Sequence, residues 1–197
     1  MFNKNMEIFV IIILGLFIIF CYNQINTVKE YLKHDITDFN YGGKNFKVQK
    51  FRNKEEAAKL LDKLCTKLEN FIDRIYKKYP NDPRCKRMKE RFDRNNILEG
   101  RPTSEDTSYS INKGETIVFC IRSKEDPNEI HDLNLILFVA LHEMAHLASI
   151  SVGHNDEFWT NFRFILREAI KMDIYTYIDF KNEPRKYCGL VVDSSPI

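Results

Sequence analysis

The residues best suited to chemistry lie in the segment 141–147, which reads LHEMAHL and contains the motif H-E-x-x-H. His142 and His146 are four residues apart, so on a helix both imidazoles lie on one face, about one turn apart. Two neutral imidazoles in this arrangement can bind one Zn²⁺. Glu143 can accept a proton from a metal-activated water and later deliver it to a leaving amine. The motif therefore predicts a zinc-dependent hydrolase with Glu143 as its general base.

A catalytic zinc also needs a third protein ligand and an open position for water. His154 is the first candidate, because Gly153 can turn the chain back towards the metal. Seven residues separate it from the second histidine of the motif, whereas the metzincin pattern has five in that interval. Glu168, on the next predicted helix, is the alternative ligand. Asp156 and Glu157 are better suited to the first turn of that helix.

Several other side chains could reach such a site. A tyrosine could stabilise a tetrahedral oxyanion, and the sequence does not choose among Tyr175, Tyr177 and Tyr187. Cys188 could approach the metal, but a thiolate as fourth ligand would close the site to water. A packing role is the simpler interpretation of each tyrosine.

Hydrophobic periodicity predicts the elements that position these residues. The segment 128–149 carries the motif and is apolar enough to be a buried helix, and the next helix begins near residue 156. An amphipathic helix is expected from Asn53 to Tyr79, with a short basic helix after it. Two strands are expected around a turn at 112–115. The second of them, Thr116–Arg122, could hold an extended substrate at a sheet edge, or be a plain core strand.

The N-terminal region has the composition of a membrane segment. Residues 8–22 read IFVIIILGLFIIFCY and carry no charge. This run predicts a transmembrane anchor over 1–28, followed by a linker over 29–44 and a folded domain over 45–197. A cleaved signal peptide is the alternative, although no small-x-small cleavage site follows the run. Lysines after the run favour a single-pass membrane protein whose catalytic domain is cytoplasmic.

The five cysteines stand far apart, are odd in number and form no C-x-x-C pair. They predict neither a disulfide scaffold nor a cysteine-built zinc module, and unpaired cysteines suit a reducing compartment.

The net charge of +2 conceals an uneven distribution of charge. Residues 44–101 hold 18 Lys and Arg against 9 Asp and Glu. Such a basic half could bind anionic lipid or nucleic acid. A solvated amphipathic helix pair explains the same charges without a partner, so nucleic acid is not the favoured partner.

The combined pattern resembles the WLM-type, SprT-related group of minimal zinc metallopeptidases. HEMAH, Gly153-His154 and the acidic, aromatic segment Glu157-Phe158-Trp159 match that group in order. Residues 110–114, 120–122 and 187–189 also resemble segments of uncharacterised metallopeptidase-like proteins of large DNA viruses. The resemblance covers about residues 45–195 and is strongest over 108–190.

The resemblance implies an α+β fold, namely a minimal zincin-like domain with its active-site helix packed on a small sheet. It also implies one zinc ion, held by His142, His146 and His154, and protein or peptide substrates. The resulting hypothesis is a membrane-anchored zinc metallopeptidase. The alternative is a non-enzymatic, zinc-stabilised module that binds membrane or nucleic acid through residues 44–101.

Overall fold

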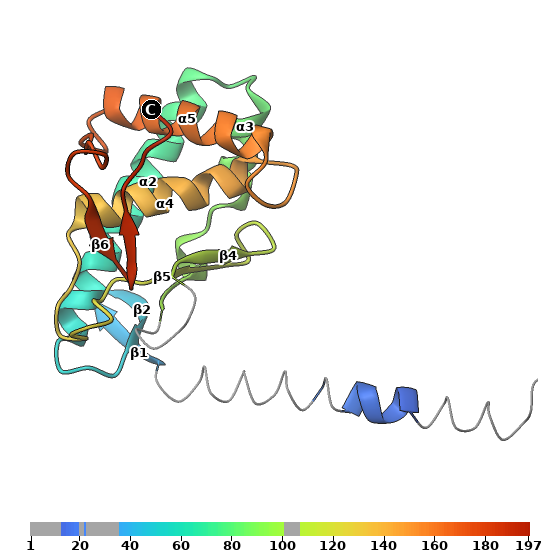
Figure 1. Cartoon of the computed structure of the whole chain (residues 1–197), viewed down its shortest axis with the longest axis vertical. Helices are drawn as coiled ribbons and strands as arrows, with labels where there is room; N and C mark the ends of the chain where they lie inside the picture. Colours follow the sequence, from blue (N-terminus) through green and yellow to red (C-terminus); the bar gives the residue numbers. More distant parts are fainter. Residues whose placement is uncertain (1–12, 20–21, 23–35, 101–106) are drawn as a thin grey trace, which may run out of the picture. The chain divides into compact units, whose positions relative to one another are not determined.

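A computed structural model describes residues 13–19, 22, 36–100 and 107–197 of the chain (Figure 1). The chain divides into two compact units, residues 1–36 and residues 37–197. The second unit contains every candidate site residue. It mixes helices with a small sheet, as the predicted α+β class requires.

The predicted transmembrane helix is not found among the described residues of the first unit. Residues 13–19 are helical, and their apolar side chains are mostly exposed. Among the described residues no helix has the length and apolar character that a membrane span requires. The prediction of a single-pass membrane protein is therefore wrong for this part of the chain, and the rest of the expected anchor, 1–28, lies outside the described residues.

A five-stranded sheet forms one layer of the second unit, with the strand order β1-β2-β3-β5-β4. Its strands are β1 (Ile36–Tyr41), β2 (Lys44–Gln49), β3 (Ile97–Glu99), β4 (Tyr109–Ile111) and β5 (Thr116–Phe119). β2 and β5 each run parallel to β3, whereas β4 runs antiparallel to β5. β5 is thus an interior strand, so of the two interpretations of Thr116–Arg122 the structure supports the plain core strand and not the sheet edge. Among the described strands, the edge on this side is β4.

Four helices pack with the sheet around a single core. They are α2 (Lys54–Lys78), α3 (Pro83–Arg91), α4 (Leu133–Ala148) and α5 (Asp156–Lys171). A 3-10 turn, Arg94–Asn96, connects α3 to β3. A separate hairpin pairs β6 (Arg185–Tyr187) with β7 (Leu190–Val192). The segment expected to be a linker, 29–44, includes β1.

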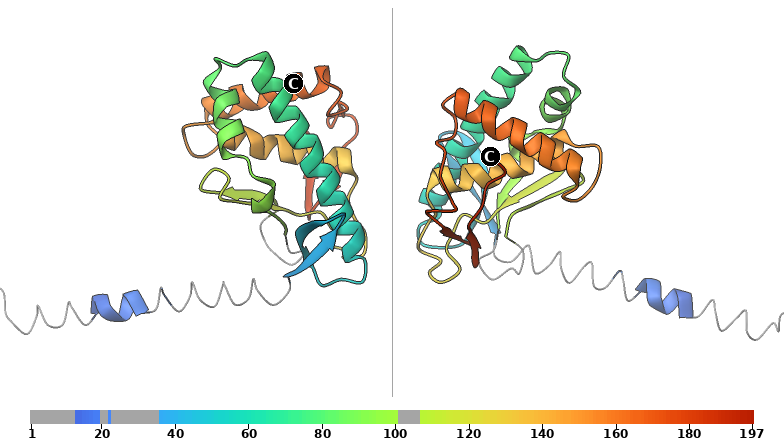
Figure 2. Two further views of the ribbon diagram at one scale, coloured as in Figure 1. Left: turned by 180° about the vertical axis from the view of Figure 1, so that it is seen from behind. Right: turned by 45° about the horizontal axis from the view of Figure 1, so that its top comes forward.

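α4 is the central helix, because it contacts β4 and β5 on one side and α2, α3 and α5 on others. Eleven of its sixteen residues are buried. Its first turn is capped by Asp132, whose carboxylate accepts hydrogen bonds from two main-chain amides of that turn. The two views of Figure 2 show α5 running alongside α4. A loop at one end, residues 149–155, joins the two helices.

The first turn of α2 has no side-chain cap. Asn53 occupies the N-cap position, but its side chain makes no capping hydrogen bond. Its amide instead donates to the carbonyl of Asn128 and accepts from Arg122. Asn53 therefore links α2 to the segment that follows β5.

Candidate metal centre and cleft

Three histidine side chains converge at the C-terminal end of α4. The Nε2 atom of His154 lies 2.9 Å from Nε2 of His142 and 3.2 Å from Nε2 of His146. The ring centroids of the three imidazoles are 4.9 to 5.0 Å apart. The structure therefore brings the two histidines of the motif and the histidine that follows it to one point.

The chemistry of this cluster fits a zinc ion. Zn–N bonds of about 2.0–2.1 Å in tetrahedral geometry place ligand nitrogens roughly 3.3 Å apart, close to the observed separations. Burial, together with the other histidines, lowers the pKa of His142 to about 3. Burial, reinforced by His154 and Lys113, lowers the pKa of His146 to about 4. Both rings are therefore neutral at neutral pH, which is the form that binds metal.

The ring of Phe158 packs against all three imidazoles. Its fully buried ring lies 4.7 Å from the ring of His142, 4.4 Å from that of His146 and 4.6 Å from that of His154, between centroids. Packing against one ring restricts the rotamers of all three histidines. Phe158 belongs to the acidic, aromatic segment 157–159 of the sequence, but its place beneath the histidine cluster was not predicted. Its spacing of four residues from His154 was the available signal.

Glu143 lies beside the histidine cluster and is almost completely buried, with 2% of its surface exposed. Burial raises the pKa of its carboxyl to about 7, and a hydrogen bond with the Ser110 side chain acts in the opposite direction. Among the described residues its Oε2 atom has no hydrogen-bond partner. A buried carboxylate oxygen without a partner is costly, so this atom is suited to a ligand or a water at the site.

A cleft of about 530 Å³ opens over these residues. The three histidines and Glu143 line one side. Residues 108–110, at the start of the edge strand β4, line another side together with Asn112 and Lys113 of the turn after it. The loop residues 151–153 complete the cleft. The cleft is large enough to admit a segment of polypeptide beside the histidines.

A comparison with known protein families identifies the family of this chain. The family model described as the WLM domain matches residues 42–195. The chain belongs to the WLM family. The prediction of a WLM-type protein with relatives in large DNA viruses is thereby confirmed.

Two viral relatives and one solved structure illustrate the similarity. The uncharacterized protein R325 of Acanthamoeba polyphaga mimivirus is 34% identical over 180 residues, covering 89% of this chain and 88% of that protein. The uncharacterized protein 136R of Invertebrate iridescent virus 6 is 31% identical over 96 residues, covering 48% and 52%. A crystal structure of a Wss1 mutant from Saccharomyces cerevisiae is 18% identical with a TM-score of 0.47, covering 64% of this chain and 89% of that one.

The alternative ligands lie away from the histidine cluster of this WLM domain. Glu168 is buried and bonded to two lysines, with its oxygens 2.7 Å from Nζ of Lys78 and 2.8 Å from Nζ of Lys171. Asp156 and Glu157 occupy the first turn of α5, as expected. Of the described residues, the histidines alone form a group of potential metal ligands.

The three candidate tyrosines have different surroundings. Tyr175 is buried beside Phe138, and Tyr177 is 47% exposed. Burial is the main cause of the raised pKa of Tyr187, and the charge of Glu143 also raises it. Of the three tyrosines, Tyr187 is therefore the one that lies near Glu143. Its hydroxyl shares a 2.7 Å hydrogen bond with Ser108, which lines the cleft.

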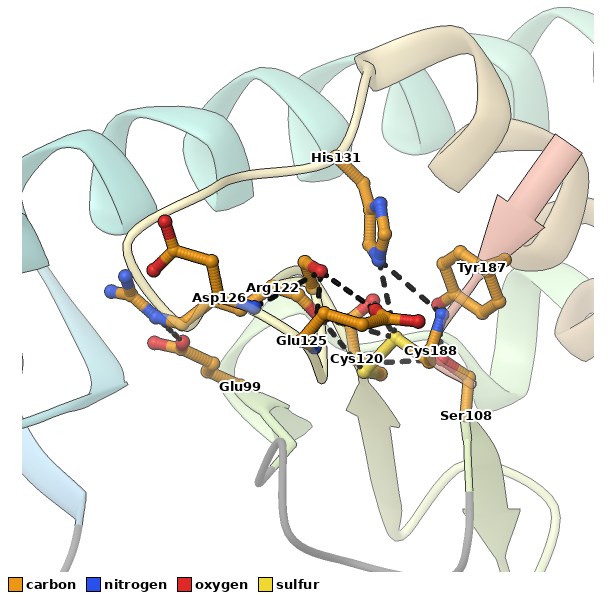
Figure 3. Close-up of a disulfide and its surroundings, with 10 residues drawn as sticks. Glu99, Ser108, Cys120, Arg122, Glu125, Asp126, His131, Tyr187 and Cys188 are labelled. Carbon is orange, nitrogen blue, oxygen red and sulfur yellow. Dashed lines mark hydrogen bonds and ion pairs between the residues drawn. A yellow bond between two sulfur atoms is a disulfide. The ribbon is translucent and has the colours of Figure 1, made fainter. Parts of the chain in front are cut away.

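Cys188 is not near the metal centre but forms a disulfide with Cys120 (Figure 3). The prediction of unpaired cysteines is therefore wrong for Cys120 and Cys188, and the argument for a reducing compartment loses its basis. The disulfide ties the end of β5 to the turn between β6 and β7. Ser108 connects the same elements, since its hydroxyl accepts from the amide of Cys120 while bonding to Tyr187.

Part of the basic half packs against the C-terminal end of α4. Arg87 donates to the carbonyl of Ala148, and Arg91 donates to the carbonyls of Leu147 and Ser149. Cations at a helix C-terminus satisfy carbonyls that lack intrahelical partners and interact favourably with the helix dipole. At these positions the excess of positive charge supports the helix that carries the site.

Proposed function

We propose that this WLM domain is a zinc-dependent metallopeptidase that hydrolyses peptide bonds in protein or peptide substrates. Membership of the WLM family supports a metallopeptidase-type function. The observation that carries the proposal is the convergence of three Nε2 atoms beside a buried carboxylate on an open cleft. His142, His146 and His154 would hold the ion. Zinc at such a site acts as a Lewis acid and lowers the pKa of a coordinated water to about 7.

Glu143 has the position and the environment of a general base. Its partner-free Oε2 atom would accept a proton from the attacking water and pass it to the nitrogen of the leaving amine. The raised pKa of its carboxyl suits both steps, because a group with a pKa near neutrality can take up and release a proton at neutral pH. Ser110 would orient the carboxylate through their hydrogen bond.

The edge strand β4 would align the substrate. Among the described residues it is the last strand of the sheet, and residues 108–110 line the cleft. An extended peptide can add to a sheet edge through main-chain hydrogen bonds, which give affinity without strict sequence requirements. Such binding would bring a main-chain carbonyl of the substrate beside the histidines.

The substitution Glu143→Gln tests the role of the base. It preserves side-chain shape, so the variant is expected to bind zinc as the wild type does, while hydrolysis of an unfolded protein such as casein falls at least about a hundredfold. Zinc content is measured by metal analysis after dialysis, and hydrolysis by the release of new amino termini. Asp156→Asn, which removes a charge from an exposed carboxyl on α5, serves as the control. Cleavage by the Glu143→Gln variant at the wild-type rate would remove the assigned role.

The same purified protein also tests the alternative function, a non-enzymatic binding module. A non-enzymatic module that binds nucleic acid through residues 44–101 would retain zinc, cleave nothing, and bind DNA with a steep dependence on salt. Zinc-dependent cleavage by the wild type, lost in the Glu143→Gln variant, would favour the peptidase.

A further inference from the structure

The loop that returns the chain to the metal centre is longer than the five-residue interval of the metzincin pattern. Seven residues separate His146 from His154, and the loop leaves α4 at Ser149. Gly153 has a φ of 83°, a conformation that favours glycine, and reverses the chain directly before His154. Ile150 and Val152, on the same loop, are 70% and 87% exposed. Burial of apolar side chains therefore does little to hold the loop in place.

A carboxylate from α5 binds the amides of this loop. Oε1 of Glu157 accepts a hydrogen bond of 2.8 Å from the amide of Ile150, and Oε2 accepts one of 2.9 Å from the amide of Ser151. Oε2 also accepts a hydrogen bond from the Ser151 hydroxyl. Arg87 approaches the same carboxylate at 3.9 Å. Hydrogen bonds to an ionised acceptor are stronger than neutral ones, so these bonds can fix an exposed backbone.

An ammonium group from the opposite side of the cleft binds the carbonyls of the loop. Nζ of Lys113 donates to the carbonyl of Ser149 at 2.9 Å and to that of Ser151 at 2.7 Å. Lys113 belongs to the turn between β4 and β5. The next residue, Gly114, fits so closely against α3 that a Cβ atom there would lie 2.5 Å from the carbonyl oxygen of Arg91. The turn that carries the ammonium is therefore held firmly.

The two charged groups act on one peptide segment. The amide of Ser151 is bound by Glu157 and its carbonyl by Lys113, so both main-chain polar groups of this residue are bound. Ser151 is three residues before His154. Fixing its main chain leaves Val152 and Gly153 as the links between the bound segment and the imidazole.

We propose that Glu157 and Lys113 are positioning residues that hold the main chain of residues 149–151 so that the His154 imidazole reaches the other two histidines. Neither residue contributes a ligand atom to the cluster. Glu157 and Lys113 lower the conformational entropy that the loop loses when metal binds. Without these two side chains the loop samples other conformations, and metal binding has to restrict the loop to one of them.

The test measures zinc affinity by competition with a chromophoric chelator. Glu157→Gln and Lys113→Met are each expected to raise the dissociation constant for zinc at least about tenfold, the range found when groups that orient ligands are removed. Asp156→Asn removes an equal charge from the same first turn of α5 without touching the loop bonds, and is expected to change affinity less than about twofold. Glu157→Asp retains the charge but is too short to reach both amides, so it should resemble Glu157→Gln.

A second readout concerns the zinc-free protein. Amide hydrogen exchange at Ile150 and Ser151 is expected to accelerate in the Glu157 and Lys113 variants and to stay unchanged in Asp156→Asn. Wild-type zinc affinity in Glu157→Gln, Glu157→Asp and Lys113→Met would overturn the inference. It rests on the proposed zinc site but not on hydrolysis. Weaker zinc binding in these variants, with a wild type that cleaves no peptide, would support the positioning role and overturn the peptidase.

Discussion

Arg122 and Glu99 form an ion pair inside the domain, where neither side chain has any exposed surface. Glu99 ends β3, and its second carboxylate oxygen accepts a 2.7 Å hydrogen bond from the amide of Gln49 on β2. Arg122 follows β5 and also donates to the carbonyl of Pro127 and to Asn53. The pair therefore connects three neighbouring parts of the sheet to the start of α2.

Removing one partner of this pair is predicted to be far more harmful than removing both. Glu99→Leu leaves a buried guanidinium uncompensated, which costs about 3–5 kcal/mol of unfolding free energy, and Arg122→Met leaves a buried carboxylate at a similar cost. The double variant should lose much less than the sum of the two. Urea denaturation of the four proteins gives the coupling energy. Additive losses would mean that the two groups stabilise the domain independently.

The disulfide between Cys120 and Cys188 is predicted to stabilise the domain by about 2–4 kcal/mol, because it closes a loop across a separation of 68 residues. Reduction should lower the urea midpoint of the wild type by a corresponding amount. Cys188→Ser serves as control, since reductant should not affect it further. Cys65 and Cys85 are free and buried, and burial raises their pKa values to about 12 and about 11, so their thiols stay protonated and unreactive. An unchanged midpoint on reduction would contradict the prediction.

The local part of the site could be predicted from the sequence because it depends on helical spacing. His142, Glu143 and His146 lie within five residues of one helix, so their relative positions follow from its geometry. His154 could be proposed from the glycine before it and the resemblance to WLM proteins. The α+β class of the fold followed from the same resemblance.

The rest depends on contacts between segments far apart in the sequence. The order of strands put β4 at the edge and β5 inside, which no local pattern distinguishes, because both are short and partly apolar. The partner of Cys188 lies 68 residues away, and the carbonyls bound by Lys113 lie 36 and 38 residues away. The anchor was predicted from apolar composition alone, and the described residues contain no helix with the length and apolar character of a membrane span.

Zinc is predicted to raise the melting temperature of the wild type. A ligand present at a hundred times its dissociation constant stabilises the folded state by about 2.7 kcal/mol, which corresponds to roughly 5–10 °C for a domain of this size. His154→Ala should lose most of this shift because one of three ligands is gone. His131→Ala, which removes a histidine outside the cluster, should retain it. Differential scanning calorimetry with and without zinc measures the shift. Equal shifts in all three proteins would place the metal elsewhere.

The carboxylate of Glu157 is predicted to make the stability of the zinc-free domain depend on acid pH. Hydrogen bonds from the Ser151 hydroxyl and from the amides of Ile150 and Ser151 lower its pKa from 4.5 to about 2. A group whose pKa is lower in the folded state stabilises that state above its unfolded pKa, and this contribution is lost as the pH falls towards the folded value. Glu157→Gln should therefore be less stable than the wild type at about pH 6, and the difference should narrow between about pH 4.5 and about pH 2. Urea denaturation across this range measures it, with Asp156→Asn as the matched loss of charge on α5. A difference between wild type and Glu157→Gln that stays constant down to about pH 2 would show that the carboxylate is not held by these hydrogen bonds in solution.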